Sequence, residues 1–312
     1  MHAPFETPAA IPTPTALKKT ALFIVNPFSG TRSKERKAAL IREHVPAGAF
    51  DYQVAFTEAK GHAVELAARA VADGVDYVVA VGGDGTMNEA ARSLVGTTTA
   101  LGIIPMGSGN GLARHLGVPL DTVGALRLLS KARPVTIDSA TLNGTPFFCT
   151  AGAGFDAYIG LKFEGKKKRG FGAYVRTTLR EFLGYRPDVY RLTVGGVTTE
   201  RPAFLVSFAN AAQYGNNAFI APQASIRDGL LDLCVMKPFP YAAALPLGLK
   251  LFGRTLHQSP YLEITRTREV VVERPGPGPI HLDGEPHWMP AALHVQLVPA
   301  SLRVLAGKEE GI

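Results

Sequence analysis

The segment with the clearest chemical potential is 82–86, where the order G-G-D-G-T places three glycines around Asp84. The apolar run before it, 78–81, and the helical pattern that begins at Met87 predict a strand, a tight loop and a helix. Glycines let the backbone approach a ligand closely, and the N–H groups that begin a helix favour an anion. Because Asp84 would repel a phosphate, the loop predicts a divalent cation between the two, Mg²⁺ with retained waters. The simpler alternative is a strand-to-helix turn in which Asp84 caps the helix.

Four short strand-like runs, most of them apolar throughout, alternate with helical patterns before residue 134. These runs are 21–25, 52–56, 77–81 and 100–104. Uninterrupted apolar runs of this length are typical of parallel strands buried on both faces, so the pattern predicts a doubly wound α/β sheet. Polar, glycine-rich loops follow three of the runs, at 26–30, 82–86 and 105–110. We expect these loops to converge at one edge of the sheet, where open α/β sheets bind ligands.

The pattern changes after Pro134, where short strand-like runs are joined by Gly, Asn and Pro turns. These runs are 135–142, 147–151, 189–194, 202–210, 231–235, 261–265, 269–273 and 293–298. They predict a β-rich, sandwich-like second domain, interrupted by two helices near 170–183 and 241–252. The predicted division of the chain is a disordered tail (1–17), an α/β domain (18–134) and a β-rich domain (135–298), with 299–312 free to return to the first domain.

The composition favours an anionic partner, because Lys and Arg outnumber Asp and Glu by 33 to 26 and the pI is near 9.4. The one basic run, 166–169, lacks interleaved aromatic residues, so we expect no nucleic-acid partner. Two cysteines at no metal-ligand spacing indicate free thiols. No stretch reaches the roughly 18 to 20 apolar residues of a spanning helix, so any membrane contact would be peripheral.

Four motifs occur in one order along the chain: N-P-x-S-G (26–30), G-G-D-G-T (82–86), P-x-G-S-G-N (105–110) and D-G-E (283–285). Together they resemble the lipid kinase superfamily of diacylglycerol, sphingosine and ceramide kinases, in particular its bacterial members. The resemblance covers nearly the whole chain after residue 18 and implies that ATP binds the first domain and that Asp84 positions Mg²⁺. The nucleotide-binding residues it implies are Asn26, Ser29, Gly30, Thr57, Gly82, Gly83, Asp84, Gly85, Thr86, Asn88 and Ser108.

The segment Asp283-Gly284-Glu285 supplies carboxylates in the β-rich domain. A hydroxyl group that attacks a phosphoryl group must lose its proton, and a carboxylate within hydrogen-bond reach can serve as the base. The resemblance implies that this segment closes over a cleft between the domains against Asp84. Glu285 is our first choice for the base and Asp283 the second. Read alone, the segment is a glycine-centred hairpin turn with solvated acids.

A further Asp-Gly pair at 228–229 precedes an apolar strand, which by itself indicates a turn. In related bacterial kinases the matching loop binds a structural Mg²⁺ ion. The resemblance implies that Asp228 and the main-chain carbonyls of Ser225 and Leu230 would hold such an ion here.

The basic loop Lys166-Lys167-Lys168-Arg169 stands before the amphipathic pattern of 170–183. It is either a solvated face or a patch that docks on an anionic membrane, where each basic residue contributes about 1 kcal/mol. We favour docking, which implies a cytoplasmic protein that acts peripherally at the inner face of the membrane. The sequence leaves a homodimer open.

The function that the resemblance implies is an ATP-dependent lipid kinase, which transfers the γ-phosphoryl group to the free hydroxyl of a membrane lipid such as diacylglycerol. The G-S-G-N form at 107–110 is typical of sphingosine kinase-like members, so a sphingoid base or ceramide is the alternative acceptor. A NAD kinase shares the G-G-D-G loop and a β-rich second domain and is a more distant alternative. A catalytically silent lipid-binding or nucleotide-binding module is another, although Asp84, Asp283 and Glu285 are all present.

Overall fold

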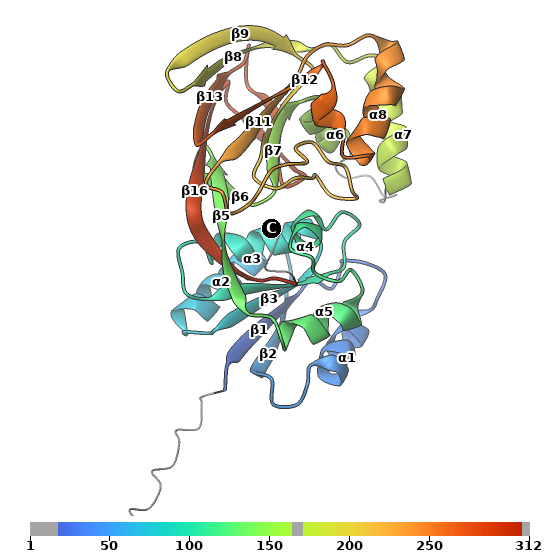
Figure 1. Cartoon of the computed structure of the whole chain (residues 1–312). Helices are drawn as coiled ribbons and strands as arrows, with labels where there is room; N and C mark the ends of the chain where they lie inside the picture. Colours follow the sequence, from blue (N-terminus) through green and yellow to red (C-terminus); the bar gives the residue numbers. More distant parts are fainter. Residues whose placement is uncertain (1–17, 164–170, 308–312) are drawn as a thin grey trace, which may run out of the picture.

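A computed structural model describes residues 18–163 and 171–307 (Figure 1). The first domain alternates strands and helices as predicted. In chain order its elements are β1 (Thr20–Val25), α1 (Lys34–His44), β2 (Asp51–Phe56), α2 (His62–Ala72), β3 (Tyr77–Gly82), α3 (Asp84–Arg92), β4 (Ala100–Pro105), α4 (Gly111–His115) and α5 (Thr122–Leu129). The strands pair in parallel in the order β2-β1-β3-β4. The central residues of β3 and β4 are buried on both faces, which explains their uninterrupted apolar runs, whereas β2 is a partly exposed edge strand.

The second domain is a β-sandwich with three helices. Its strands are β5 (Pro134–Leu142), β6 (Thr145–Phe147), β7 (Thr150–Gly154), β8 (Asp188–Val194), β9 (Val197–Ala203), β10 (Leu205–Ala209), β11 (Leu231–Met236), β12 (Leu262–Thr267), β13 (Glu269–Glu273), β14 (Gly278–Leu282), β15 (Glu285–Met289) and β16 (Ala292–Leu305). Six of them form one sheet in the order β12-β11-β10-β7-β14-β15. The second layer contains β13, β16 and β8, and an apolar core lies between the layers. The fold class predicted from the sequence, an α/β domain followed by a β-rich sandwich, is therefore confirmed.

Strand β16 joins the two domains. It runs antiparallel to β5 and β13, shifts its register between Val298 and Leu302, and then pairs in parallel with β4 through Val304 and Leu101. The larger sheet therefore continues from the first domain into the sandwich. Leu302, Val304 and Leu305 are buried in the core of the first domain.

Three details of the sandwich differ from the predicted strands. The predicted run 202–210 spans the end of β9 and all of β10, so β9 was not predicted as a separate strand. The run 147–151 is broken at Phe148 and Cys149, between β6 and β7, because the backbone there turns its N–H groups towards Asp283. The hairpin β14–β15 was not predicted, because it contains glycine and proline residues such as Gly278 and Pro286, which are typical of turns and not of strands.

Three helices cover the outer face of the six-stranded sheet (Figure 1). They are α6 (Phe155–Phe163), which the sequence pattern did not predict, α7 (Phe171–Phe182) and α8 (Ala244–Phe252), which follows the short 3₁₀ turn Tyr241–Ala243. A second apolar core, rich in aromatic rings, lies between these helices and the sheet. Among the described residues, no helix is both long and apolar enough to cross a membrane.

Candidate active site

Three glycine-rich loops follow β1, β3 and β4 and pack on one another at the carboxyl edge of the first sheet. The Asn26 side-chain amide donates to the Thr86 hydroxyl at 3.0 Å, which ties the first loop to the second. Gly83 and Gly107 lie so close that a Cβ on Gly107 would come within 2.8 Å of the Gly83 Cα. Glycine is thus required here for contact between loops as well as for access by a ligand.

Lys37 of α1 fixes the first loop by hydrogen bonds to its backbone. Its side chain is fully buried, and its ammonium group donates to the main-chain oxygens of Asn26, Pro27 and Ser29 at 2.6–2.9 Å. Burial lowers the pKa of Lys37. Lys37 was not predicted from the sequence, although a signal was present: it precedes Leu40 and Ile41 by three and four positions, on the buried stripe of α1.

Asp84 is the first residue of α3, and its side chain makes no cap on that helix, so the simple N-cap alternative is wrong. Its two carboxylate oxygens instead accept from the backbone N–H groups of Asn110 and Gly111, at 2.9 and 2.8 Å, where α4 begins. Burial raises the pKa of Asp84, and these two hydrogen bonds oppose the rise. Asp84 therefore fixes the third loop against the second.

Asp283 occupies the turn between β14 and β15 with a positive φ of 49°. Its carboxylate accepts from the backbone N–H groups of Phe148, Cys149 and Thr150 at 2.7–3.1 Å, and from the side-chain amide of Asn88 at 2.6 Å. Burial raises the pKa of Asp283, and the donated hydrogen bonds oppose this. Asp283 therefore accepts four hydrogen bonds, and the one from Asn88 connects α3 to the sandwich.

Glu285, two residues after Asp283, has a different environment. Its side chain is 26% exposed, and its Oε2 lies 3.7 Å from the Lys60 ammonium nitrogen. Its Oε1 packs so closely on Gly85 that a Cβ there would collide with it. The carboxylate consequently lies beside the N-terminus of α3, at the second glycine loop.

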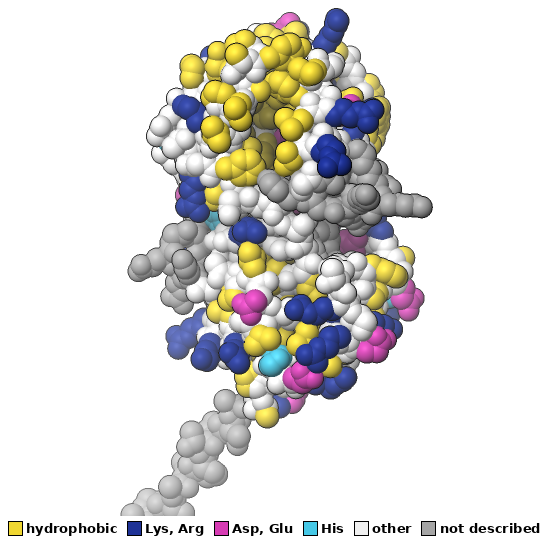
Figure 2. Space-filling view, turned by 90° about the vertical axis from the view of Figure 1, so that its right-hand side faces the viewer, with side chains coloured by type: hydrophobic (Ala, Val, Ile, Leu, Met, Phe, Trp, Pro, Cys, Tyr) yellow, Lys and Arg dark blue, Asp and Glu magenta, His cyan; other side chains and the backbone are white. Residues whose placement is uncertain are grey.

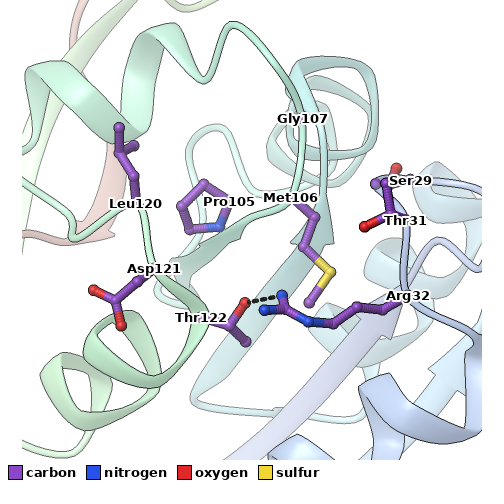
Figure 3. Close-up of a pocket in the computed structure, with 10 residues that line it drawn as sticks. Ser29, Thr31, Arg32, Pro105, Met106, Gly107, Leu120, Asp121 and Thr122 are labelled. Carbon is purple, nitrogen blue, oxygen red and sulfur yellow. Dashed lines mark hydrogen bonds between the residues drawn. The ribbon is translucent and has the colours of Figure 1, made fainter.

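A cavity of about 310 Å³ opens beside the first and third loops (Figure 3). Its walls are Ser29, Gly30, Thr31, Arg32, Pro105, Met106, Gly107, Leu120, Asp121 and Thr122. The Arg32 guanidinium donates to the Thr122 hydroxyl at 2.8 Å across its floor, as Figure 3 shows. The lining residues that lie in the motifs read from the sequence are Ser29, Gly30, Pro105, Met106 and Gly107. The residues at the start of α5 were missed because no spacing links them to the loops.

The remaining predicted nucleotide-binding residues lie along the same edge. Thr57 is buried at the end of β2, and its N–H donates to the Val25 carbonyl at 3.0 Å, beside the first loop. Ser108 is exposed at the tip of the third loop. Asn88 is buried with its side-chain oxygen unpartnered among the described residues, one turn into α3 from Asp84. The structure thus brings the predicted set together, and its role in binding ATP stays a prediction.

A Mg²⁺ ion fits the chemistry at Asp84 better than at Asp228. Mg²⁺ commonly takes one or two carboxylates together with waters and phosphate oxygens, and each Asp84 oxygen keeps a further lone pair. Asp228 instead accepts from the Arg266 guanidinium at 2.7 Å and from the Leu230 N–H at 3.1 Å. Within the described ranges no three His, Cys, Asp or Glu side chains cluster to hold a metal. The Arg266 guanidinium already balances the charge of Asp228, which makes this loop less suited to a cation than Asp84, and the ion at Ser225, Asp228 and Leu230 stays a prediction.

The remaining sequence predictions lie outside the described residues. These are the tail 1–17 and the basic loop Lys166–Arg169.

A Rossmann-like domain and a β-sandwich that meet at glycine loops and an acidic turn define a two-domain kinase fold. Residues 20–142 match the family model of the diacylglycerol kinase catalytic domain, and residues 149–306 match that of the YegS C-terminal NAD kinase beta sandwich-like domain. The chain therefore belongs to the diacylglycerol kinase-like family of lipid kinases, as the motifs predicted.

Individual relatives agree with this assignment. A protein of Chromohalobacter salexigens, named for its likeness to the lipid kinase YegS, is 33% identical over 72% of this chain and 75% of its own. A Mycobacterium tuberculosis protein named diacylglycerol kinase is 33% identical over 77% of this chain and 80% of its own. The crystal structure of a diacylglycerol kinase from Bacillus anthracis superposes with a TM-score of 0.74 at 22% identity, over 96% of this chain and all of that one, which shows a common fold.

Proposed function

We propose that the protein transfers the γ-phosphoryl group of ATP to the free hydroxyl group of a membrane lipid such as diacylglycerol, working peripherally at the inner face of the membrane. The observation that carries the proposal is the place of Glu285, whose carboxylate packs on Gly85 where α3 begins. A helix N-terminus with glycine loops on either side suits phosphate groups, and a carboxylate beside it suits the removal of a proton from the acceptor.

Each group of residues has a separate role in this reaction. Backbone N–H groups and the hydroxyls of Ser29, Thr86 and Ser108 would bind the phosphates. When bound, Mg²⁺ neutralises charge on the transferring phosphoryl group. Asp84 holds the second and third loops together through Asn110 and Gly111. Glu285 accepts the proton of the lipid hydroxyl.

The acceptor is tested by incubating the purified protein with ATP, Mg²⁺ and a total lipid extract and identifying the products by mass spectrometry. We expect phosphatidic acid from diacylglycerol. Phosphorylated sphingoid bases or ceramide would move the acceptor to the alternative lipid class. NADP formed from added NAD, without any lipid product, would overturn the proposal in favour of a NAD kinase, and the absence of all products would favour a silent module.

The base is tested by the variant Glu285→Gln, which keeps the shape of the side chain but cannot take the proton. We expect kcat to fall about 100-fold to 10,000-fold, with nucleotide affinity preserved. Glu58→Gln is the matched control, because Glu58 is an exposed acid in the neighbouring loop after β2. Turnover by Glu285→Gln equal to that of the control would exclude Glu285 as the base.

A further inference from the structure

Helices α7 and α8, with the residues that directly follow α7 and precede α8, carry a set of exposed apolar side chains. Figure 2 shows hydrophobic side chains gathered on this side of the sandwich domain, with a hollow among them. We call the set the apolar face. Each of its members is between 45% and 74% exposed, and they are Leu179, Leu183, Tyr241, Leu245, Leu249 and Phe252.

Helix α8 is apolar on two opposite sides. Leu245, Leu249 and Phe252 follow one another at helical spacing and face outward, whereas Leu247 and Leu251 pack into the aromatic core beneath. A surface helix of a soluble domain normally carries polar residues on its outer side. The outer side of α8 is therefore suited to an apolar partner.

The outward sides of the two helices form one continuous surface. The Tyr241 hydroxyl, just before α8, donates to the Leu183 carbonyl at 3.1 Å, directly after α7. The Tyr241 ring also packs on Phe182, with 5.6 Å between ring centroids. Apolar patches of several side chains on a folded chain mark sites of interaction with proteins, ligands or membranes.

Basic side chains border the apolar face. Arg176 and Arg180 share the outward side of α7 with Leu179, at spacings of three and four residues, and the Arg180 side chain is 85% exposed. Glu181, the acid of this helix, accepts from the Tyr158 hydroxyl at 3.0 Å with one oxygen, and its other oxygen lies 3.9 Å from the Arg180 Nε; two arginines still outnumber this one acid. The border of the apolar face on α7 is thus positively charged.

We infer that the apolar face docks the protein on an anionic lipid bilayer, with Leu245 and Leu249 among the acyl chains and Arg176 and Arg180 at the headgroups. Apolar side chains below a basic border are the pattern by which helices bind the membrane interface. The inference deepens the proposed function, because a lipid acceptor would lie in that bilayer. A second copy of this chain is a poorer partner, since a two-fold contact would bring the arginine borders of both copies together.

The test is sedimentation with vesicles of phosphatidylcholine and phosphatidic acid, without nucleotide. Leu245→Ser with Leu249→Ser should lower the vesicle partition coefficient at least about tenfold. Val189→Ser with Val197→Ser is the matched control, because these side chains are similarly exposed on β8 and β9, away from the face, and we expect binding within about twofold of the unaltered protein.

The charge contribution is tested separately. Arg176→Gln with Arg180→Gln should weaken binding at low salt, and the difference should shrink as salt is raised. The matched control is Arg42→Gln with Arg69→Gln, which removes the same charge from exposed positions on α1 and α2. We expect this pair to leave vesicle binding unchanged at low salt.

Three results would overturn docking: no binding of the unaltered protein to these vesicles, equal loss in the Leu245/Leu249 and Val189/Val197 variants, or a dimer of the unaltered protein that the Leu245/Leu249 variant dissociates while vesicle binding is unchanged. The vesicles contain no lipid with a free alcohol group, so a wrong kinase assignment leaves the measurement intact. Conversely, turnover of a water-soluble short-chain diacylglycerol should be the same in the Leu245/Leu249 variant and the unaltered protein.

Discussion

Besides strand β16, which runs through both domains, the two domains contact each other at two seams that are built in different ways. At the first seam a buried carboxylate, Asp283, receives four donors, and the one from the first domain, Asn88, is 2.6 Å away. At the second, residues 212–217 lie on the third glycine loop and α4. The contacts there are longer: the Asn216 N–H donates to the Gly109 carbonyl at 3.3 Å and the Ala212 N–H to the His115 Nδ1 at 3.4 Å.

The difference indicates how the domains would move. Hydrogen bonds to an ionised acceptor are roughly twice as strong as neutral ones, and short bonds are stronger than long ones. We therefore expect the first seam to hold its geometry while the second opens more readily. Glu285 would then keep its place at α3 during such motion, because only Gly284 separates it from Asp283.

The largest expected effect comes from breaking the first seam. Asp283→Ala leaves the buried N–H groups of Phe148, Cys149 and Thr150 without their acceptor, so we expect the free energy of unfolding to fall by about 3 to 5 kcal/mol. Urea denaturation measures the loss. Glu285→Ala, in the same turn, should change stability by less than about 0.5 kcal/mol. Equal losses in the two variants would show that the turn, and not the four hydrogen bonds, matters.

The second seam should respond to acid through His115. Burial lowers the pKa of His115 to about 4, so this imidazole stays neutral in the folded protein while it protonates near pH 6.5 in the unfolded chain. Between these values the unfolded state binds more protons, and stability falls as the pH falls, by up to about 3 kcal/mol at pH 4. Urea midpoints from pH 8 to pH 4 should show this slope, and His115→Gln should reduce it. If the stability of the His115→Gln variant depended on pH as steeply as that of the unaltered protein, His115 would not be the cause of the slope.

The smallest effect concerns local opening in the unaltered protein. We expect the amide hydrogens of Ala212 and Asn216 at the second seam to exchange with solvent faster than those of Cys149 and Thr150 at the first, by a difference of about 1 to 2 kcal/mol in opening free energy. Hydrogen exchange followed by NMR measures both sets in one sample. Slower exchange at the second seam than at the first would show that the second seam is the more stable of the two.

The sequence predicted the parts of the site that are local. The second and third glycine loops follow apolar strands, and strand, loop and helix are adjacent in the chain, so their patterns can be read from 82–86 and 105–110. What could not be predicted depends on residues far apart. Asp283 and Asn88 are separated by 195 positions, and no local pattern links them; only the resemblance to lipid kinases placed 283–285 against the second glycine loop.

Two further residues show where sequence reasoning fails. Lys37 was not singled out in the sequence, yet its ammonium group is buried because three main-chain oxygens of the first loop offer it acceptors. The resemblance implies a metal at Asp228, and the structure adds that the Arg266 guanidinium on β12 lies beside that carboxylate, which the sequence did not indicate. In both cases the deciding partner belongs to another element, and only the folded chain brings it close.

The route of β16 has a consequence for biosynthesis. In the first sheet β4 lies between β3 and β16, so its second neighbour is made about 200 residues after β4 itself. At ribosomal speeds of about 5 to 20 residues per second this delay is about 10 to 40 s. An unpaired strand edge is a template for unwanted pairing between chains. We therefore expect the nascent protein to depend on chaperones until β16 is complete, although its first domain begins near the start of the chain.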